Sequence, residues 1–182
     1  SATLITSVQI TGSGKLIYTH ANAAQNKIGV ISSTGYNTAN GTADCLLTTA
    51  VNAPAAAAFP TSSVYLAGPR QLLVAYAGNT TTTDINSIYA YDFDETTGQL
   101  SNATRAYQDT SVIYGASAMT FDTENNFLYV ATANSNTTTV NNYNIEKFQY
   151  NSSTKLLTRV GTSPFGANWI GSKCISSMFI GQ

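Results

Sequence analysis

Charged side chains are scarce in this sequence: they make up 9% of the residues, against about 25% in an average soluble protein. Eight basic and nine acidic residues leave a formal net charge of −1. A nucleic-acid-binding surface needs clustered Lys and Arg to displace counterions from phosphates, and an anionic membrane attracts the same charge. We therefore expect neither nucleic acid nor a membrane surface as a partner.

Long apolar runs and helical periodicity are also missing. No run approaches the roughly 18 residues that a membrane span requires, so we predict no span. No charged segment followed by an apolar one opens the chain, so no targeting segment is visible. The Ala-rich run at residues 53–58 is short and flanked by Pro54 and Pro60, which favours a connection between strands over a helix.

Cysteine and histidine are almost absent. Cys45 and Cys174 form either one disulfide or two buried thiols, and we predict the disulfide, which would stabilise the fold by ~4–5 kcal/mol in the chain-entropy model. One histidine and no C-x-x-C motif make a zinc site a poor explanation. No metal, cofactor or catalytic residue is predicted.

Thr, Ser, Asn and Tyr dominate what remains, and they suit pleated, half-buried strands. We therefore predict a single all-β domain over residues 1–182. A repeat of 56 residues organises it: residues 8–21 align without a gap with residues 64–77, and a further shift places Leu128 under Leu72 and Leu16.

Each copy contains four apolar or alternating runs separated by turns, which predicts four antiparallel strands. The predicted strands are residues 7–10, 16–20, 27–32 and 43–49 in the first copy, 63–66, 72–76, 87–93 and 100–107 in the second, and 117–121, 127–132, 143–150 and 155–161 in the third.

Four-stranded units of about 40–50 residues, repeated in tandem, are the blades of a β-propeller. We place the copies at about residues 4–56, 62–110 and 111–170. The segment 174–180 reads C-I-S-S-M-F-I and is similar to the start of the third copy. The prediction is thus a β-propeller-like fold of three four-stranded antiparallel blades plus one extra C-terminal strand.

Residues 121–136, F-D-T-E-N-N-F-L-Y-V-A-T-A-N-S-N, resemble a blade of the lactonase-type seven-bladed propellers, which include gluconolactonase-like proteins, muconate-cycloisomerising enzymes and YVTN surface repeats. Residues 92–100, D-F-D-E-T-T-G-Q-L, resemble the second half of such a blade. The family's usual Pro-Asp-Gly turn is replaced here by Thr-Glu-Asn-Asn. The resemblance implies the architecture, and no set of enzymatic residues matches.

Propellers have about 4–8 blades, so three blades leave apolar faces and strand edges to be covered. We expect self-association or a second propeller half as the partner, with strand donation by the C-terminal segment as one mode. The residues predicted to donate are Ile175, Met178, Phe179 and Ile180.

Few side chains suggest chemistry. His20 ends a strand, where a structural or surface role is favoured over general acid–base catalysis. Asp92, Asp94 and Glu95 precede a turn and are interpreted as turn-forming residues, with a calcium loop as the alternative. The tyrosines of the third strands are expected to pack between blades, with a carbohydrate or protein ligand as the alternative.

Five Asn-x-Ser/Thr sequons fall in predicted turns or at the start of a fourth strand, where a glycan would reach solvent. They are Asn40, Asn79, Asn102, Asn136 and Asn151. Together with the low charge they favour an extracellular or cell-surface glycoprotein with a structural, adhesive or self-assembling role. The alternative is a lactonase- or cycloisomerase-like enzyme, which the family resemblance alone supports.

Overall fold

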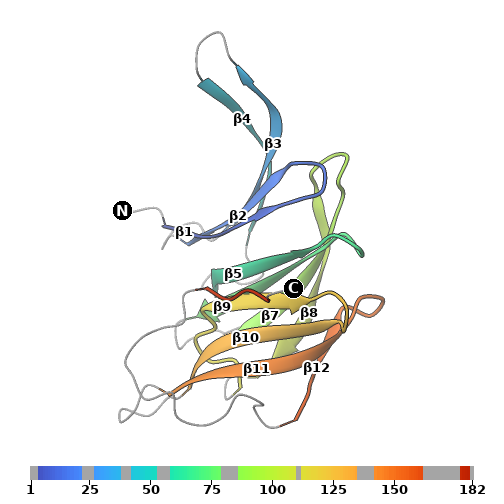
Figure 1. The fold of residues 1–182 in the computed structure, drawn as a ribbon. Coiled ribbons are helices and arrows are strands. Elements are labelled where there is room, and N and C mark those ends of the chain that lie inside the picture. Colours follow the sequence, from blue (N-terminus) through green and yellow to red (C-terminus); the bar gives the residue numbers. More distant parts are fainter. Residues whose placement is uncertain are drawn as a thin grey trace.

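The computed structural model describes residues 4–21, 27–37, 42–52, 58–78, 86–109, 112–134, 142–161 and 177–180. These residues form three separate four-stranded antiparallel sheets, and within each sheet every strand pairs with its neighbour in sequence (Figure 1). The predicted all-β fold of three antiparallel blades is confirmed. No helix among the described residues is long and apolar enough to cross a membrane.

Each blade is a meander of four strands. The first blade contains β1 (Leu4–Ile10), β2 (Leu16–Ala21), β3 (Lys27–Asn37) and β4 (Thr42–Asn52); the middle blade contains β5 (Ala58–Leu66), β6 (Gln71–Gly78), β7 (Ser87–Phe93) and β8 (Leu100–Gln108); the third blade contains β9 (Ala118–Asp122), β10 (Phe127–Asn134), β11 (Asn142–Asn151) and β12 (Leu156–Arg159).

The 56-residue period is also present in the backbone. The turn that joins the first two strands of each blade ends on a left-handed residue, at Gly14 (φ 77°), Arg70 (φ 54°) and Asn126 (φ 58°). Glycine adopts this conformation freely and asparagine does so more readily than most side chains, whereas arginine is strained there. The hairpin geometry is therefore kept even where the residue type is not.

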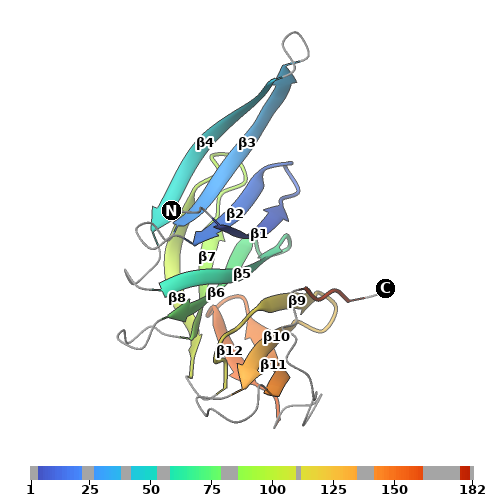
Figure 2. The same ribbon diagram turned by 90° about the vertical axis from the view of Figure 1, so that its left-hand side faces the viewer.

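The blades are arranged as in a propeller, with their first strands side by side. Strand β5 contacts both β1 and β9, while the outer hairpin β3–β4 extends away from the other blades (Figures 1 and 2). At equivalent positions of the first two blades, the Ser7 and Ser63 hydroxyl oxygens lie 2.8 Å apart and share a hydrogen bond. The Gln9 amide also donates to the Ser63 carbonyl, at 2.9 Å.

Blades one and two meet in one apolar core, which we call the first interface. Alternating residues of the first blade (Ile17, Ile28 and Val30) pack there against residues of β6 and β7. The middle-blade members are Leu72, Val74, Tyr76, Tyr89, Tyr91, Phe93 and Leu100. Because side chains alternate along a strand, only one face of each blade contributes.

Blades two and three meet in the second interface, which uses the opposite face of the middle blade. Leu73, Ala75, Ile88 and Ala90 belong to this core. The third-blade members include Met119, Leu128, Val130, Phe148, Tyr150 and Leu157. The small side chains of Ala75 and Ala90 leave room for large ones on the third blade, which fills the space between the sheets.

The two interfaces bury the middle blade on both faces. Every residue from Gln71 to Tyr76 is buried, whereas in β2 burial alternates between half-exposed and buried residues. The end blades therefore each keep one face that no other described blade covers.

The predicted extra C-terminal strand differs from what the structure shows. Residues 177–180, its described part, run beside β9 but belong to no sheet (Figure 1). A blade's first strand is held by hydrogen bonds to its second strand, and no further strand among the described residues is placed to supply them. Strand donation by this segment stays a prediction.

Candidate functional site: the open faces of the end blades

The first blade has an apolar open face. On β1, the side chains of Ile5, Val8 and Ile10 are 57%, 53% and 71% exposed. On β2, the ring of Tyr18 lies over Gly29, so close that a Cβ at that glycine would lie 2.2 Å from it. Gly29 faces Tyr18 across the β2–β3 ladder, and its missing side chain lets the ring lie flat on the sheet.

The third blade has an open face of different composition, carrying aromatic rings and one cation. The Lys147 ammonium lies 3.6 Å from the centre of the Phe127 ring and 5.7 Å from that of Tyr129. An ammonium over an aromatic face is attracted by the ring quadrupole, and its aliphatic stem covers further apolar surface. This face is thus apolar with a positive group held against it.

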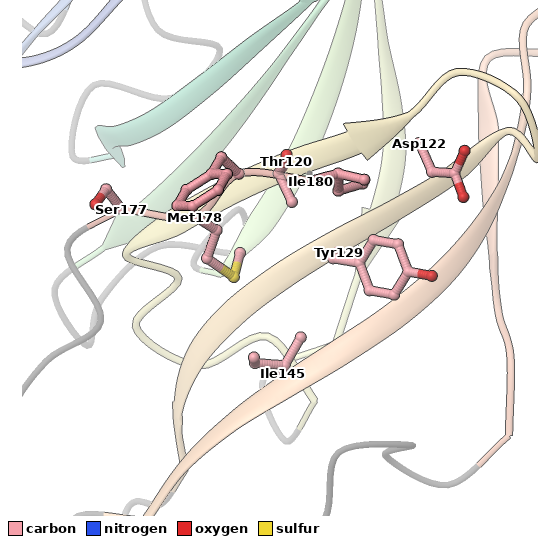
Figure 3. Close-up of a pocket in the computed structure, with 8 residues that line it drawn as sticks. Thr120, Asp122, Tyr129, Ile145, Ser177, Met178 and Ile180 are labelled. Carbon is pink, nitrogen blue, oxygen red and sulfur yellow. The ribbon is translucent and has the colours of Figure 1, made fainter. Parts of the chain in front are cut away.

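The C-terminal segment 177–180 lies over part of the third blade's open face and leaves a cavity beneath it. The cavity has a volume of about 400 Å³ and is lined by Thr120, Asp122, Tyr129, Ile145 and residues 177–180 (Figure 3). A second hollow of about 740 Å³ extends along residues 120–124. The segment itself is open to solvent, since Phe179 is 89% exposed.

Asp122, the acidic residue of this cavity, accepts hydrogen bonds from the turn that follows it. Asp122 Oδ1 accepts hydrogen bonds from the backbone N–H groups of Glu124 and Asn125, at 3.0 and 3.1 Å, and Oδ2 accepts one from the Asn125 amide. The hydrogen bonds from Asn125 hold the pKa of Asp122 below its usual range. Such a carboxylate caps a turn and is a weak general base, so the cavity suits apolar contact better than proton transfer.

Polar contacts join neighbouring blades near two sets of turns: the turn between the first and second strands of one blade and the turn between the third and fourth strands of the next. At the first interface, the Glu95 carboxylate accepts a hydrogen bond from the Ser13 N–H at 2.9 Å and one from the Tyr65 hydroxyl at 2.5 Å. The Lys15 ammonium donates to the Glu95 carbonyl, also at 2.5 Å. The hydrogen bonds from Ser13 and Tyr65 lower the pKa of Glu95. Burial and the same Glu95 contact raise the pKa of Tyr65.

An equivalent set joins blades two and three. The Lys155 ammonium lies 2.6 Å from Asp92 Oδ2 and 3.1 Å from the Asn102 carbonyl. The Gln71 amide donates to the Ser152 carbonyl at 3.0 Å. Burial alone would raise the pKa of Asp92, but hydrogen bonds from Lys155, Asn102 and Gln71 outweigh it and lower that pKa.

Lys15 and Gln71 are equivalent residues, 56 positions apart, and each donates to a backbone carbonyl in the turn between the third and fourth strands of the following blade. This shared role was not predicted from the sequence, because the two side chains differ in type and charge. The repeat alignment held the signal, since both are long donors at one position of the repeat. In the third blade this position is Phe127, which cannot donate.

The first interface also contains a buried pair of hydroxyl groups. Tyr76 and Tyr91 share a hydrogen bond of 2.8 Å within the core. Burial raises the pKa of both phenols. Tyr89 packs edge-on against Tyr76, with ring centres 5.8 Å apart. The third-strand tyrosines Tyr89, Tyr91 and Tyr150 pack between blades as predicted.

The three acids before the β7–β8 turn have separate tasks. Asp94 accepts hydrogen bonds from the N–H groups of Thr96 and Thr97, which is the predicted turn role. Asp92 pairs with blade three and Glu95 with blade one. The described residues contain no group of three or more His, Cys, Asp or Glu that could hold a metal ion.

The remaining predicted residues lie partly outside the described chain. His20 is described on β2, paired with Lys27 of β3. Cys45 lies on β4 opposite Ser33, but Cys174 is outside the described residues, so the disulfide stays a prediction. The sequons Asn40, Asn79 and Asn136 and the predicted donor Ile175 also lie outside.

Two sequons are described and differ in the amide atom that they use. The Asn102 nitrogen donates to Asp92 at 2.9 Å. Asn151 is exposed and accepts hydrogen bonds from the Ser153 and Thr154 N–H groups through its oxygen. Since a glycan attaches to the nitrogen, Asn151 is the better acceptor of the two.

Comparison with known proteins agrees with this architecture. The sequence profile of the family described as "Lactonase, 7-bladed beta-propeller" matches residues 74–168, just over half of the chain. The chain belongs to this lactonase family of seven-bladed β-propellers.

The matched part of this lactonase-family chain begins in β6 of the middle blade and extends beyond β12 of the third. A solved structure of a protein from Lactobacillus plantarum is also similar, with 16% identity and a TM-score of 0.42 over 93% of this chain. The alignment covers 59% of that protein, so this chain spans less than two thirds of its length. No curated protein matches significantly.

Proposed function

We propose that this lactonase-family chain is a structural, self-assembling propeller segment whose end blades recruit further blades. The observation that carries the proposal is the pair of open faces. The first blade has three exposed apolar side chains on β1, and the third blade has an exposed aromatic face. Both are apolar, like the surfaces that are buried between the described blades. Leaving such faces in water costs the hydrophobic free energy that covering them recovers.

The test of this proposal is the native mass of the chain, measured by size-exclusion chromatography with light scattering across a range of concentrations. We expect a species that is a multiple of the 19.2 kDa monomer. The surface control is Ala103→Glu, which adds a charge to an exposed position on the outer strand of the middle blade and should leave the mass unchanged. A compact monomer at every concentration would overturn the proposal.

The low charge and the sequons support a place for this segment at the cell surface or outside the cell, in an adhesive or scaffolding role. Of the two described acceptors, we expect Asn151 to carry a glycan and Asn102 to carry none. Peptide mass mapping of protein from a secreting eukaryotic host, before and after enzymatic deglycosylation, checks this. An unmodified Asn151 would count against the glycoprotein role.

The second candidate function is enzymatic, and family membership is the observation that favours it. A lactonase- or cycloisomerase-like chain would open or close a lactone ring, and His20 is the sole histidine available for proton transfer. The test is acid release from simple aliphatic lactones by the native chain. Hydrolysis abolished by His20→Ala and kept in Ala103→Glu would favour the enzyme, whereas no hydrolysis would favour the structural role.

A further inference from the structure

The repeat relates the open face of the first blade to the open face of the third. The second strands of the three blades occupy equivalent positions, so their side chains can be compared pair by pair. Residues 16, 72 and 128 share one position, and residues 17, 73 and 129 share the next. Because neighbouring side chains on a strand point to opposite faces, the first set marks the leading face of each blade and the second set marks the trailing face.

Both described interfaces join a trailing face to a leading face. At the first interface, Ile17 of the first blade belongs to the same core as Leu72 of the middle blade. At the second, Leu73 of the middle blade belongs to the same core as Leu128 of the third. The rule is therefore the same at both junctions, although the side chains differ.

One trailing face and one leading face are left without a blade packed on them, and these are the two open faces. No described blade packs on the trailing face of the third blade, where half-exposed Tyr129 occupies the position of Ile17 and Leu73. The first blade leaves its leading face uncovered, with half-exposed Leu16 at the position of Leu72 and Leu128. Within the described part of one copy, no free leading face contacts the trailing face of the third blade, and no free trailing face contacts the leading face of the first.

We propose that the trailing face of the third blade docks onto the leading face of the first blade in a second copy of this chain, head to tail. This inference rests on the proposed self-assembly and names its partner and register. It is carried by continuity with the two interfaces already formed, because the docked pair would repeat their face types. Such a heterologous contact builds a ring where the rotation closes and a filament where it does not.

The C-terminal segment is compatible with this docking. Residues 177–180 lie beside β9 and line a cavity with Tyr129 of β10 and Ile145 of β11, so they cover part of the trailing face. They add apolar surface to that face through Phe179 and Ile180, which are 89% and 41% exposed. Two copies joined in both directions would contain six blades, which is one fewer than in the seven-bladed family to which the chain belongs and within the range of about 4–8 blades found in propellers.

The experiment is a complementation between two face variants. Val8→Glu/Ile10→Glu places charge on the leading face, and Tyr129→Glu/Phe179→Glu places it on the trailing face. Each variant keeps the other face intact. We expect each alone to be monomeric by light scattering, and an equimolar mixture to form a species of twice the monomer mass and no larger.

Several outcomes decide the matter. A mixture that remains monomeric, or either variant that still dimerises alone through two like faces, overturns head-to-tail docking while leaving self-assembly intact. A wild-type monomer instead overturns the proposed function itself. Melting curves establish that the variants are folded. Where a variant is unfolded, a milder pair replaces it: Val8→Thr/Ile10→Thr for the leading face or Tyr129→Thr/Phe179→Ser for the trailing face. Threonine keeps a strand-compatible residue on β1 and β10. These pairs are expected to weaken assembly at least tenfold and to complement in the same way.

Discussion

The middle blade and the two end blades are built from the same repeat but differ in what surrounds them. Strand β6 is buried on both faces, whereas β2 and β10 each have one buried and one half-open face. The residues at equivalent positions are similar: leucine at 16, 72 and 128. Burial in this molecule is therefore decided by the position of a blade in the series more than by residue type.

The comparison shows that a blade is not a self-sufficient unit. Each sheet exposes one apolar face for each neighbour that it lacks, so the stability of the assembly depends on neighbour contacts, as in other repeat proteins. Substitutions of buried residues on the middle blade should therefore lower stability strongly. Substitutions at the equivalent positions of the open faces should lower the stability of a monomer little, but they should weaken an assembly.

The largest effect is expected from truncating equivalent leucines. Leu72→Ala removes a fully buried side chain from the first interface and should lower the free energy of unfolding by about 2–5 kcal/mol. Leu16→Ala, at the equivalent half-exposed position, should cost less than half as much in the monomer. Urea denaturation at low protein concentration measures both, and equal costs would break the distinction between middle and end blades.

A smaller effect is expected from the buried hydroxyl pair, which belongs to the first interface of the middle blade. Tyr76→Phe removes the hydroxyl partner of Tyr91 inside the first interface, and we expect a loss of about 1–2 kcal/mol. The double variant Tyr76→Phe/Tyr91→Phe should cost less than the sum of the single variants, because no buried hydroxyl is then left without its partner. Thermal unfolding of the three variants tests this, and strict additivity would contradict the coupling.

The smallest effect concerns the ion pair of the second interface. Asp92 is a little over one third exposed, so Lys155→Met should cost about 1 kcal/mol or less at pH 7. The pKa of Asp92 is lowered in the folded protein, so this stabilisation is present above its ordinary value and is lost as the pH falls through the folded value. Unfolding measured from pH 7 to pH 2 should show the wild-type and variant curves converging.

The control for this ion pair is the Asp92→Asn background. There, the effect of Lys155→Met should lose its pH dependence, because the titrating carboxylate is gone. If the substitution at position 155 kept the same pH-dependent effect in that background, another acid would be responsible.

Sequence alone predicted the order of the twelve strands, because the alternation and the turns that define them are local, but it predicted some strands too short: β3 continues to Asn37 and β5 begins at Ala58, beyond the predicted 27–32 and 63–66. The prediction for residues 87–93 coincides with β7, and β2 extends one residue beyond the predicted 16–20. The left-handed turn positions recur with the same period, so the hairpins follow from the repeat. The acids of the β7–β8 turn were also interpreted correctly where the contact is local, as at Asp94.

Contacts between blades were not predictable in the same way. Lys155 and Asp92 are 63 residues apart, and Glu95 and Ser13 are 82 apart, so no local pattern connects them. Residues 177–180, the described part of the C-terminal segment, show the opposite error: the segment's sequence is similar to a first strand, but a strand forms only where a ladder partner is present. Sequence similarity indicated its strand propensity, and its surroundings decided its conformation.

The serial order of the interfaces also has a consequence during biosynthesis. The face of the first blade that carries Ile17, Ile28 and Val30 has no cover until the middle blade has left the ribosome. At translation rates of about 5–20 residues per second, one repeat takes roughly 3–11 seconds to emerge. Throughout that interval this apolar face of the nascent sheet is exposed to solvent, so we expect a chaperone to bind the growing chain there.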